Sequence, residues 1–407
     1  MSKILGVISE YNPMHNGHQY HLEESLKLVD PDFSVCIMSG NFMERGDTAI
    51  ISKWARTKAA LKAGFDMVIE LPTIYSISSA ENFAAGAIKI LNTLGEDVTL
   101  SFGSECGDVD VLNKFAKILL EEPPEYVTML KHELAKGLPF PKARENALLL
   151  YLNDIRKSAH VLSEPNNILG IEYLKQIQKT NNKIKAISIK RIGSGYNSSS
   201  TSSEYSSATA IRELLMNQKS VKKFMPTVSY EILKEECALG NFVLGLSEFE
   251  KEILYKIRSM SIKELSKVPD VAEGLEYKIK EAANSCNKLD DLIFMIKSKR
   301  YTLTRIHRIL LYILLDINDT DYSNSKRIIP YIRVLGVSQA GKHFLSELSI
   351  NKKNNIVTSV KEFLDTSNNR ILKSMLEKDI YASNIYTLAY KKNSSANLDY
   401  TEKLIVV

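Results

Sequence analysis

A cluster of histidines near the start of the chain has the residue types and the spacing for phosphate chemistry. The sequence has seven histidines, and three of them, His15, His18 and His21, stand at intervals of three residues behind Pro13. If a helix begins near residue 16, these imidazoles lie about one turn apart on one helix face. Such rings can donate hydrogen bonds to phosphate oxygens as negative charge develops on them. We therefore predict that His15 and His18 are catalytic and that His21 lies outside the chemistry.

The residues around these histidines suit a nucleotide triphosphate. The amides and the dipole of a helix N-terminus favour phosphate, and Gly17 removes a side chain where backbone and phosphate must approach closely. Capping or surface exposure is the structural alternative for one histidine, but it explains a pair at this spacing less well. Zinc is a second alternative. No cysteine lies nearby and helical zinc ligand pairs are spaced by four residues, so we predict no metal site formed by the protein.

The elements around the histidines predict an α/β fold. Residues 4–9 (ILGVIS) are apolar and end in turn-forming residues, which indicates a buried strand, and residues 16 to about 29 carry a helical pattern. Alternation of strands and helices predicts a Rossmann-like parallel sheet with helices on both faces. Ligands of such sheets bind at the carboxyl ends of the strands. Further strands are predicted at 33–39, 65–72, 98–104 and 184–192, and further helices near 52–63, 79–94 and 166–179.

The pattern also predicts two domains. Residues 1–218 form a nucleotide-binding domain that contains a helical insertion at about 109–160 and a mobile Gly/Ser-rich loop at 193–207. From about 220 onward the chain has long amphipathic stretches, so 219–407 is predicted to be a mainly helical domain. In its tail, the segments IIPYIRVLGVS and KNNIVTSV could be short strands.

Composition sets outer bounds on the function. The 407 residues, 44% hydrophobic and 25% charged, exceed one compact core, and a net charge of +5 permits a polyanionic partner. The four cysteines are scattered, which disfavours a zinc site or a disulfide framework and fits a reducing cytoplasm. No window reaches the ~18 uninterrupted apolar residues of a membrane span, and no basic leader precedes the first strand. We expect a soluble cytoplasmic protein with no membrane partner.

Two segments resemble those of known enzymes. YNPMHNGH resembles the H-x-G-H signature of the nucleotidyltransferase superfamily, which includes class I aminoacyl-tRNA synthetases. SSATAIRE, at 206–213, is similar to the I-S-S-T-x-I-R segment by which these enzymes hold nucleotide phosphates. The resemblance assigns phosphate contacts to Thr209 and Arg212, although Ala208 departs from the pattern. A guanidinium suits this role because it offers forked, permanently charged donors; the alternative for Arg212 is a solvated helix residue.

A closer resemblance covers the whole nucleotide-binding half and extends into the helical half. The segments SEYNPMHNGHQYHL, MSGNFMERGD, SKWARTKAAL, VIELP, FGSE, EPNNILGIEYL and KSKRYTLTRIHRILLYILL are similar to the bacterial tRNA(Met) cytidine acetate ligase family. The resemblance implies that acetate and ATP form acetyl-adenylate, and that the acetyl group then passes to N4 of the wobble cytidine of elongator tRNA(Met). It implies no covalent enzyme intermediate. We expect Mg²⁺ to accompany ATP.

The same resemblance implies a set of ATP-binding residues. Gly103, Asn166 and Arg191 are the contacts outside the first segment. A turn glycine is the alternative for Gly103, helix capping is the alternative for Asn166, and Arg191 suits a lid that closes basic groups over triphosphate. The contacts carried over to the first segment are Val7, Ile8, Ser9, Glu10, Asn12, Pro13, His15, Asn16, Gly17, His18 and Tyr20.

A basic window in the helical half predicts contact with RNA. Residues 297–308 (KSKRYTLTRIHR) contain no acidic residue, so they create a local positive field that could meet backbone phosphates, with rings available to stack on bases. A solvated basic face is the alternative, and it is the favoured interpretation of Lys53 and Arg56. The predicted RNA contacts are Lys297, Lys299, Arg300, Tyr301, Arg305 and Arg308.

Two other functions remain open at this point. A small-molecule adenylyltransferase would use the same two motifs, but it would need only the first half of the chain. A non-catalytic RNA-binding protein on the same fold is the other alternative, and the presence of both His15 and His18 argues against it.

Overall fold

The computed structural model describes residues 2–138, 140–153, 161–180, 183–192, 204–298, 301–350, 355–392 and 394–407. The predicted Gly/Ser-rich loop lies outside these ranges as far as residue 203. The same holds for residues 154–160 of the predicted insertion.

A single eight-stranded sheet organises the described residues, in the order β5-β4-β1-β2-β3-β6-β7, with β8 paired to β6. The strands from β5 to β3 all run parallel. Every residue of β2, FSVCIMS, is buried, as expected for a parallel strand covered on both faces. The predicted Rossmann-like α/β fold is therefore confirmed. The parallel strands are β1 (Lys3–Ser9), β2 (Phe33–Ser39), β3 (Met67–Leu71), β4 (Asp97–Ser104) and β5 (Lys185–Lys190).

Alternate residues of each central strand pack into different hydrophobic cores. Leu5 and Val7 of β1 join the core that contains Leu22 of helix α1, whereas Ile4 joins the core that contains Leu91 of helix α4. This alternation follows from the two-residue period of a strand. The helices of this half are α1 (Asn16–Val29), α2 (Lys53–Ala63), α3 (Thr73–Ser76), α4 (Ala80–Leu91), α9 (Pro165–Lys179) and α10 (Ala208–Met216).

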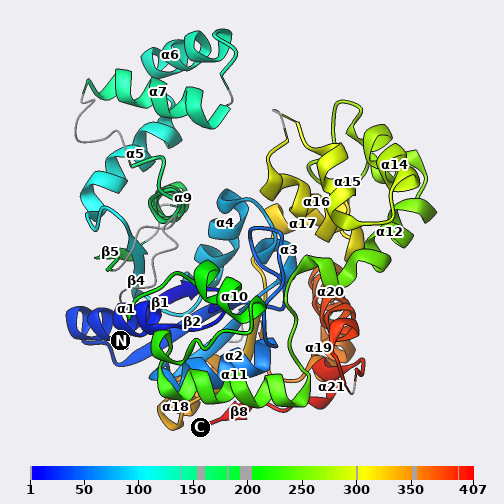
Figure 1. Ribbon diagram of the computed structural model, residues 1–407. Coiled ribbons are helices and arrows are strands. Elements are labelled where there is room, and N and C mark those ends of the chain that lie inside the picture. Colours follow the sequence, from blue (N-terminus) through cyan, green and yellow to red (C-terminus); the bar gives the residue numbers. More distant parts are fainter. Residues whose placement is uncertain are drawn as a thin grey trace.

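The predicted insertion is helical where it is described. Its helices stand beyond β4 and β5, at the end of the molecule farthest from α18 and β8 in Figure 1. They are α5 (Val109–Glu121), α6 (Pro124–Ala135) and α7 (Phe140–Leu152).

Much of the second half of the chain forms a helical lobe, seen on the right of Figure 1. Helix α16 is strongly amphipathic and buries the apolar face that contains Ile306, Ile309, Leu310 and Ile313. The elements of this lobe are η2 (Leu246–Phe249), α12 (Glu250–Ser259), α13 (Ile262–Leu265), α14 (Leu275–Ser285), α15 (Leu289–Ile296), α16 (Leu303–Leu314) and α17 (Asp319–Arg327). Two elements precede it, η1 (Lys222–Phe224) and α11 (Thr227–Leu239), and they pack against α2.

After the lobe the chain returns to the sheet. Strand β6 (Ile332–Val337) pairs antiparallel with β3, and β7 (Ile356–Val357) and β8 (Ile405–Val406) both pair parallel with β6. The strand-like segments in the tail are therefore β6 and β7. The predicted domain division at 218/219 stays a prediction, but the sheet contains strands from both sides of it. The remaining helices are α18 (Gln339–Ile350), α19 (Val360–Thr366), α20 (Arg370–Tyr386), η3 (Thr387–Ala389) and α21 (Leu398–Thr401).

A buried network of charges joins residues of the first sheet strands and helices to residues near the C-terminus. The Lys53 Nζ of α2 lies 2.7 Å from Glu70 Oε1 on β3 and 2.7 Å from Asp399 Oδ1 on α21. Arg333 of β6 completes the network, at 3.2 Å from the Glu70 carboxylate and 2.6 Å from that of Asp399. The Lys53 side chain is 0% exposed. Charges are costly to bury, so the loss of one partner from this network should be strongly destabilising.

The interpretation of Lys53 and Arg56 as a solvated basic face is wrong. Arg56 is 1% exposed, and its guanidinium donates to the carbonyls of Ile51, Glu10, Ser39 and Gly40. It thereby ties together the carboxyl ends of β1 and β2. The positive charge of the segment faces the protein interior because acceptors from distant parts of the chain meet it there.

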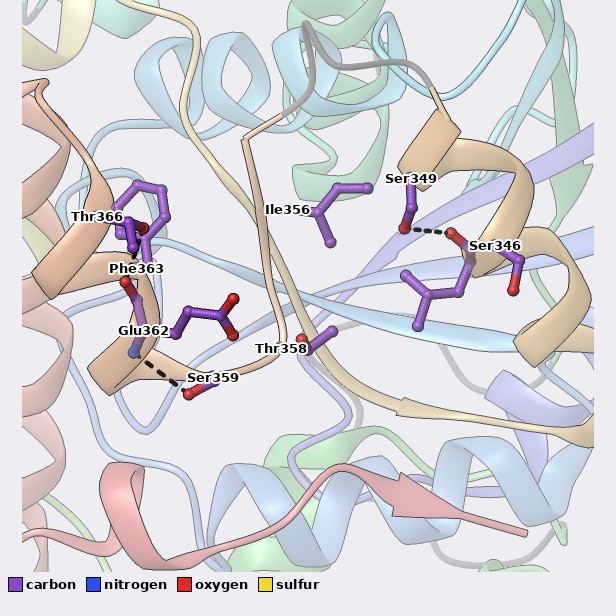
Figure 2. A pocket seen from close by; sticks show the side chains of 9 residues that line it. Ser346, Ser349, Ile356, Thr358, Ser359, Glu362, Phe363 and Thr366 are labelled. Atoms are coloured by element: carbon purple, nitrogen blue, oxygen red, sulfur yellow. Dashed lines mark hydrogen bonds between the residues drawn. The ribbon is translucent and has the colours of Figure 1, made fainter.

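A polar hollow of about 540 Å³ lies between α18, β7 and α19 (Figure 2). Its polar groups bond locally: Ser349 Oγ donates to the Leu345 carbonyl, Thr366 Oγ1 to the Glu362 carbonyl, and the Glu362 amide to Ser359 Oγ. These bonds stabilise helix turns.

No helix among the described residues is long and apolar enough to cross a membrane.

Candidate active site

Most of the sequence-predicted ATP residues meet in one cavity of about 460 Å³. The cavity lies at the carboxyl ends of β1, β4 and β5, where ligands of open α/β sheets bind. Pro13 and Asn16 do not line it, and the Asn16 side-chain amide donates instead to the carbonyls of Glu204 and Lys223, at 3.0 Å each. The predicted residues that line the cavity are Val7, Ile8, Ser9, Glu10, Asn12, His15, Gly17, His18, Tyr20, Gly103, Asn166, Arg191, Thr209 and Arg212.

The first two histidines form a reciprocal cap at the start of α1. His15 is the N-cap residue, and its Nδ1 accepts from the Gly17 amide at 3.1 Å. His18 Nδ1 accepts from the His15 amide at 3.3 Å. An imidazole nitrogen that accepts carries no proton, so in each ring the proton resides on Nε2. Both caps therefore prepare an Nε2–H donor, and among the described residues neither Nε2 has a hydrogen-bond partner.

Both rings are neutral at physiological pH. Burial, aided by the charge of Arg191, lowers the pKa of His15 to about 3. Burial and then the neighbouring His15 lower the pKa of His18 well below its ordinary value. The two rings stack with centroids 3.7 Å apart. A neutral imidazole keeps one N–H donor, which can hydrogen-bond to phosphate oxygens as negative charge develops on them.

Tyr11 packs against the ring of His18. Its ring is buried, and its centroid lies 5.0 Å from that of His18 in an edge-on arrangement. The backbone of Tyr11 has a φ of 47°, in the left-handed region that a bulky residue rarely adopts. Sequence reasoning missed this residue, because neither its conformation nor its contact is visible in a motif.

The second predicted segment also lies at a helix start. Ser207 caps α10 by accepting from the Ala210 amide at 3.2 Å. Arg212 donates to the Asn12 carbonyl at 3.1 Å and to Thr209 Oγ1 at 3.3 Å. These bonds attach α10 to the histidine loop. Ala208, where the family pattern is broken, is the first residue of the helix.

Glu105 fixes the segment that contains Asn166. Its carboxylate accepts from the Asn166 side chain at 2.6 Å and from the Asn167 amide at 2.9 Å. Asn167 Oδ1 in turn accepts from the Cys106 amide at 3.1 Å. The N-cap residue of α9 is Glu164, so neither asparagine caps the helix. Asn166 is held at the cavity wall by a residue that follows β4.

The packing of the protein does not require a glycine at position 103. A Cβ atom added there would lie 3.6 Å from Arg191 Cγ and 3.9 Å from His21 Cδ2, which are ordinary contacts. Within the protein itself a methyl group would therefore fit. The absence of a side chain at Gly103 leaves cavity volume for a ligand.

Gly103→Ala should therefore separate binding from folding. We expect its thermal unfolding midpoint to match that of the wild type, because the new methyl group meets no close neighbour. ATP affinity should fall by about tenfold, or about 1.4 kcal/mol. Isothermal titration with ATP measures the affinity and calorimetric unfolding provides the control. Unchanged affinity in a folded variant would exclude contact between Gly103 and the nucleotide.

His21 lines the cavity, although the spacing argument placed it outside the chemistry. Its Nε2 lies 3.1 Å from Ser101 Oγ, which is 2.7 Å from Ser25 Oγ. Burial, with a further contribution from Arg191, lowers the pKa of His21 to about 4.

This lowered pKa makes His21 a source of acid sensitivity. Since the unfolded state takes up the proton first as pH falls below 6.5, His21 lowers the free energy of unfolding between pH 6.5 and 4. His21→Gln removes this titration and should reduce the loss at pH 4 by about 3 kcal/mol. Urea unfolding at pH 7, 5.5 and 4 measures the effect. Parallel pH profiles of the two proteins would contradict the assignment.

The predicted RNA window is largely occupied by the protein itself where it is described. Tyr301 is 8% exposed and donates its hydroxyl to the Ala272 carbonyl, so its ring is packed rather than presented to a base. Arg305 stacks on that ring at 4.7 Å and donates to the Asp270 carbonyl. Arg308 pairs with Glu44 and Asp270 at 3.9 and 3.8 Å. Lys297 is exposed, and Lys299 and Arg300 lie outside the described residues.

Several cavity residues were not predicted from the sequence. Glu44 was accessible to prediction, because it follows the predicted strand 33–39 at the edge where ligands bind. Arg45 follows Glu44 directly. Most of the others come from helices or from segments distant in sequence, where no local pattern marks them. Besides Tyr11 and His21, they include Glu44, Arg45, Ala80, Phe83, Tyr173, Tyr205 and Thr304.

Comparison with known proteins identifies relatives over nearly the full length of this chain. The family model described as HIGH Nucleotidyl Transferase matches residues 2–401. The tRNA(Met) cytidine acetate ligase of Caldanaerobacter subterraneus subsp. tengcongensis is 45% identical over 98% of this chain and 99% of its own. That of Acetivibrio thermocellus is 41% identical over the full length of both chains.

Solved structures agree with these sequence relatives. Thermotoga maritima TmcAL in its apo form superposes with a TM-score of 0.93 at 33% identity, covering 100% of this chain and 99% of that one. The same protein bound with alpha-thio ATP superposes with a TM-score of 0.91 at 33% identity, with the same coverage. The likeness extends over both halves of the chain.

Proposed function

Because this chain belongs to the HIGH nucleotidyl transferase family and, within it, to the tRNA(Met) cytidine acetate ligases, we propose that it is an ATP-dependent ligase that acetylates tRNA. It activates acetate as acetyl-adenylate and transfers the acetyl group to N4 of the wobble cytidine of elongator tRNA(Met). The observation that carries this proposal is the pair of prepared Nε2–H donors in a cavity that three arginines line, Arg45, Arg191 and Arg212.

In the first step a carboxylate oxygen of acetate attacks the α-phosphorus of ATP and pyrophosphate leaves. Negative charge builds up on the phosphate oxygens, where His15 and His18 donate their Nε2–H groups and Arg191 and Arg212 supply permanent charge. The start of α1 adds its amides and dipole. Each of these groups stabilises the transition state more than the bound substrates, which is what accelerates the step.

In the second step the cytidine amine attacks the acetyl carbonyl carbon and AMP leaves. The mixed anhydride is already activated, so the protein contributes chiefly by holding the two reactants together. No covalent bond to the protein is needed.

We propose Mg²⁺ as the companion of the ATP phosphates, whose charge it would neutralise. Among the described residues no group of three or more His, Cys, Asp or Glu side chains could hold a metal ion. The proposal therefore assigns the ion no ligand from the protein.

We assign tRNA binding to the helical lobe and to the cavity rim beside it. We also propose that the protein is cytoplasmic. Lys297 supports this assignment as an exposed cation in the predicted window, and Lys299 and Arg300 belong to the same proposal. Counterion release predicts that tRNA binding weakens steeply as salt rises.

One assay tests the proposed function. The protein is incubated with labelled acetate, ATP, Mg²⁺ and tRNA(Met), and the digested nucleosides are analysed by mass spectrometry. We expect labelled N4-acetylcytidine together with AMP and pyrophosphate. Transfer of a nucleotidyl group to a small molecule would instead identify an adenylyltransferase, and the absence of any product would favour a non-catalytic RNA-binding protein.

A further inference from the structure

The cavity wall also carries two carboxyl groups, Glu10 and Glu44, and this part of the wall is its second end; Glu10 is also one of the predicted ATP contacts. This end is lined by Glu10, Glu44, Phe83, Tyr173 and Thr304. Thr304 belongs to α16 of the helical lobe, whereas Glu10 and Glu44 follow β1 and β2. The second end therefore lies where the nucleotide-binding sheet meets the lobe assigned to tRNA.

Two carboxyl groups define this end. Glu10 is already engaged, because its Oε1 accepts from the Glu44 amide at 2.8 Å. The Glu44 carboxylate has an ion pair of 3.9 Å with Arg308 Nη1 and, within the described ranges, accepts no hydrogen bond. Its side chain is 24% exposed, into the cavity. Glu44 thus presents an acceptor with free capacity at the wall of the active site.

The loop that contains Glu44 is fixed against α16. Gly46, at φ 78°, lies so close to the helix that an added Cβ would stand 2.4 Å from His307 Cβ and 2.6 Å from the Arg308 nitrogen. The Met43 amide donates to the Asp47 carbonyl at 2.9 Å, and Asp47 Oδ1 accepts from the Leu246 amide at 3.2 Å. Contact with the lobe therefore sets the position of Glu44.

The electrostatic surroundings leave Glu44 ready to exchange a proton near neutrality. Burial raises the pKa of Glu44, Arg308 opposes the rise, Glu10 adds to it and Arg45 opposes it, and the net result is a pKa of about 7. Tyr173 of α9 faces the same pair: burial, then Glu10 and Glu44, raise the pKa of its hydroxyl well above the ordinary value. A general base works best when its pKa lies near the working pH.

The cytosine amine needs such a group. Its N4 carries hydrogen-bond donors, and carboxylates are the side chains that accept from cytosine N4. On attack, the N4 lone pair forms the bond to the acetyl carbonyl carbon, the C–O bond to AMP breaks, and AMP leaves with that electron pair. One N4 proton must then go to a base.

We propose that the Glu44 carboxylate accepts a hydrogen bond from N4 of the target cytosine and takes the proton released during acetyl transfer. This inference rests on the proposed function and adds a catalytic residue to its second step. Glu10 acts as a positioning residue, because it holds the Glu44 backbone.

The test compares the two half-reactions in Glu44→Gln. Glutamine keeps the shape and a hydrogen-bond acceptor but cannot take the proton. Acetate-dependent ATP–pyrophosphate exchange, which reports adenylate formation, should match that of the wild type. Single-turnover transfer of labelled acetyl to tRNA should slow by about tenfold to a hundredfold. In the wild type this rate should rise with pH through about 7, because the base must be ionised, and the variant should lack that rise.

Two further variants control the result. Glu44→Asp retains a carboxylate, so the rise with pH should persist at a lower rate even if Glu44→Gln folds poorly. Glu96→Gln removes an exposed carboxylate just before β4, at the amino ends of the strands and so away from the cavity at their carboxyl ends. It should behave as the wild type in both assays.

Other outcomes would overturn one idea or the other. Transfer at the wild-type rate with an unchanged pH profile in Glu44→Gln would exclude the proton-accepting role, as would equal loss of exchange and transfer in a folded Glu44→Gln. If the wild type itself showed no acetate-dependent exchange, the proposed function would fail before Glu44 came into question.

Discussion

Replacing His18 by alanine is expected to slow acetyl-adenylate formation by about 10²–10³-fold, the usual cost of one lost donor in a charge-stabilising site. The variant loses an Nε2–H aimed into the cavity and also the acceptor of the His15 amide. Both losses act on the phosphate end of the cavity. Acetate-dependent ATP–pyrophosphate exchange measures the rate. Affinity for tRNA, measured at fixed salt, should stay within about twofold because no predicted RNA contact changes.

A surface histidine provides the matched control. His343 of α18 has a side chain that is 75% exposed, and His343→Ala should leave exchange unchanged. If His18→Ala retained wild-type exchange, the histidine pair would have no role in the chemistry. If tRNA affinity fell as far as exchange, the separation of the two ends of the cavity would be wrong.

Asp399→Leu should destabilise the protein by about 3–5 kcal/mol, because it leaves Lys53 and Arg333 as buried charges short of one partner. Burial opposes ionisation of Asp399, but these two cations outweigh it and hold its pKa below the ordinary value. Urea unfolding at pH 7 measures the change in the free energy of unfolding.

A second substitution distinguishes charge from packing. In Asp399→Leu two buried cations share the single Glu70 carboxylate, and Lys53→Met combined with Asp399→Leu leaves only the pair between Glu70 and Arg333, so the double variant should be more stable than Asp399→Leu alone. Asp365→Leu, at an exposed position of α19, serves as the control and should change stability by less than about 0.5 kcal/mol. Additive losses in the double variant would mean that the network is not electrostatically coupled.

The parts of this molecule that the sequence revealed are those whose physics is local. His15 caps a helix that begins one residue later, and its partner is three residues away, so spacing alone brought the two rings together. The strands of the parallel sheet were visible as short apolar runs between turn residues. The role of Arg212 followed from resemblance, and its bond to the Asn12 carbonyl across 200 residues agrees with its place beside the histidine loop.

The parts that the sequence concealed depend on partners far along the chain. Lys53 looks like a solvated cation until Asp399, 346 residues later, is brought beside it. Tyr301 looks like an exposed stacking ring, but in the fold its hydroxyl donates to the Ala272 carbonyl and Arg305 of α16 lies on its ring. Glu44 lies just after a predicted strand, but its importance comes from the contact of Gly46 with α16, which no local pattern encodes.

The pairing of β6 with β3 limits how the chain can be divided for study. In a fragment that ended at residue 218, β3 would become an open edge, and its sequence MVIEL would offer unpaired backbone groups to neighbouring molecules. Such a fragment is prone to aggregate even though it contains both motif segments. A soluble ATP-binding unit would have to retain β6, for example through a shortcut that replaces the intervening helical lobe.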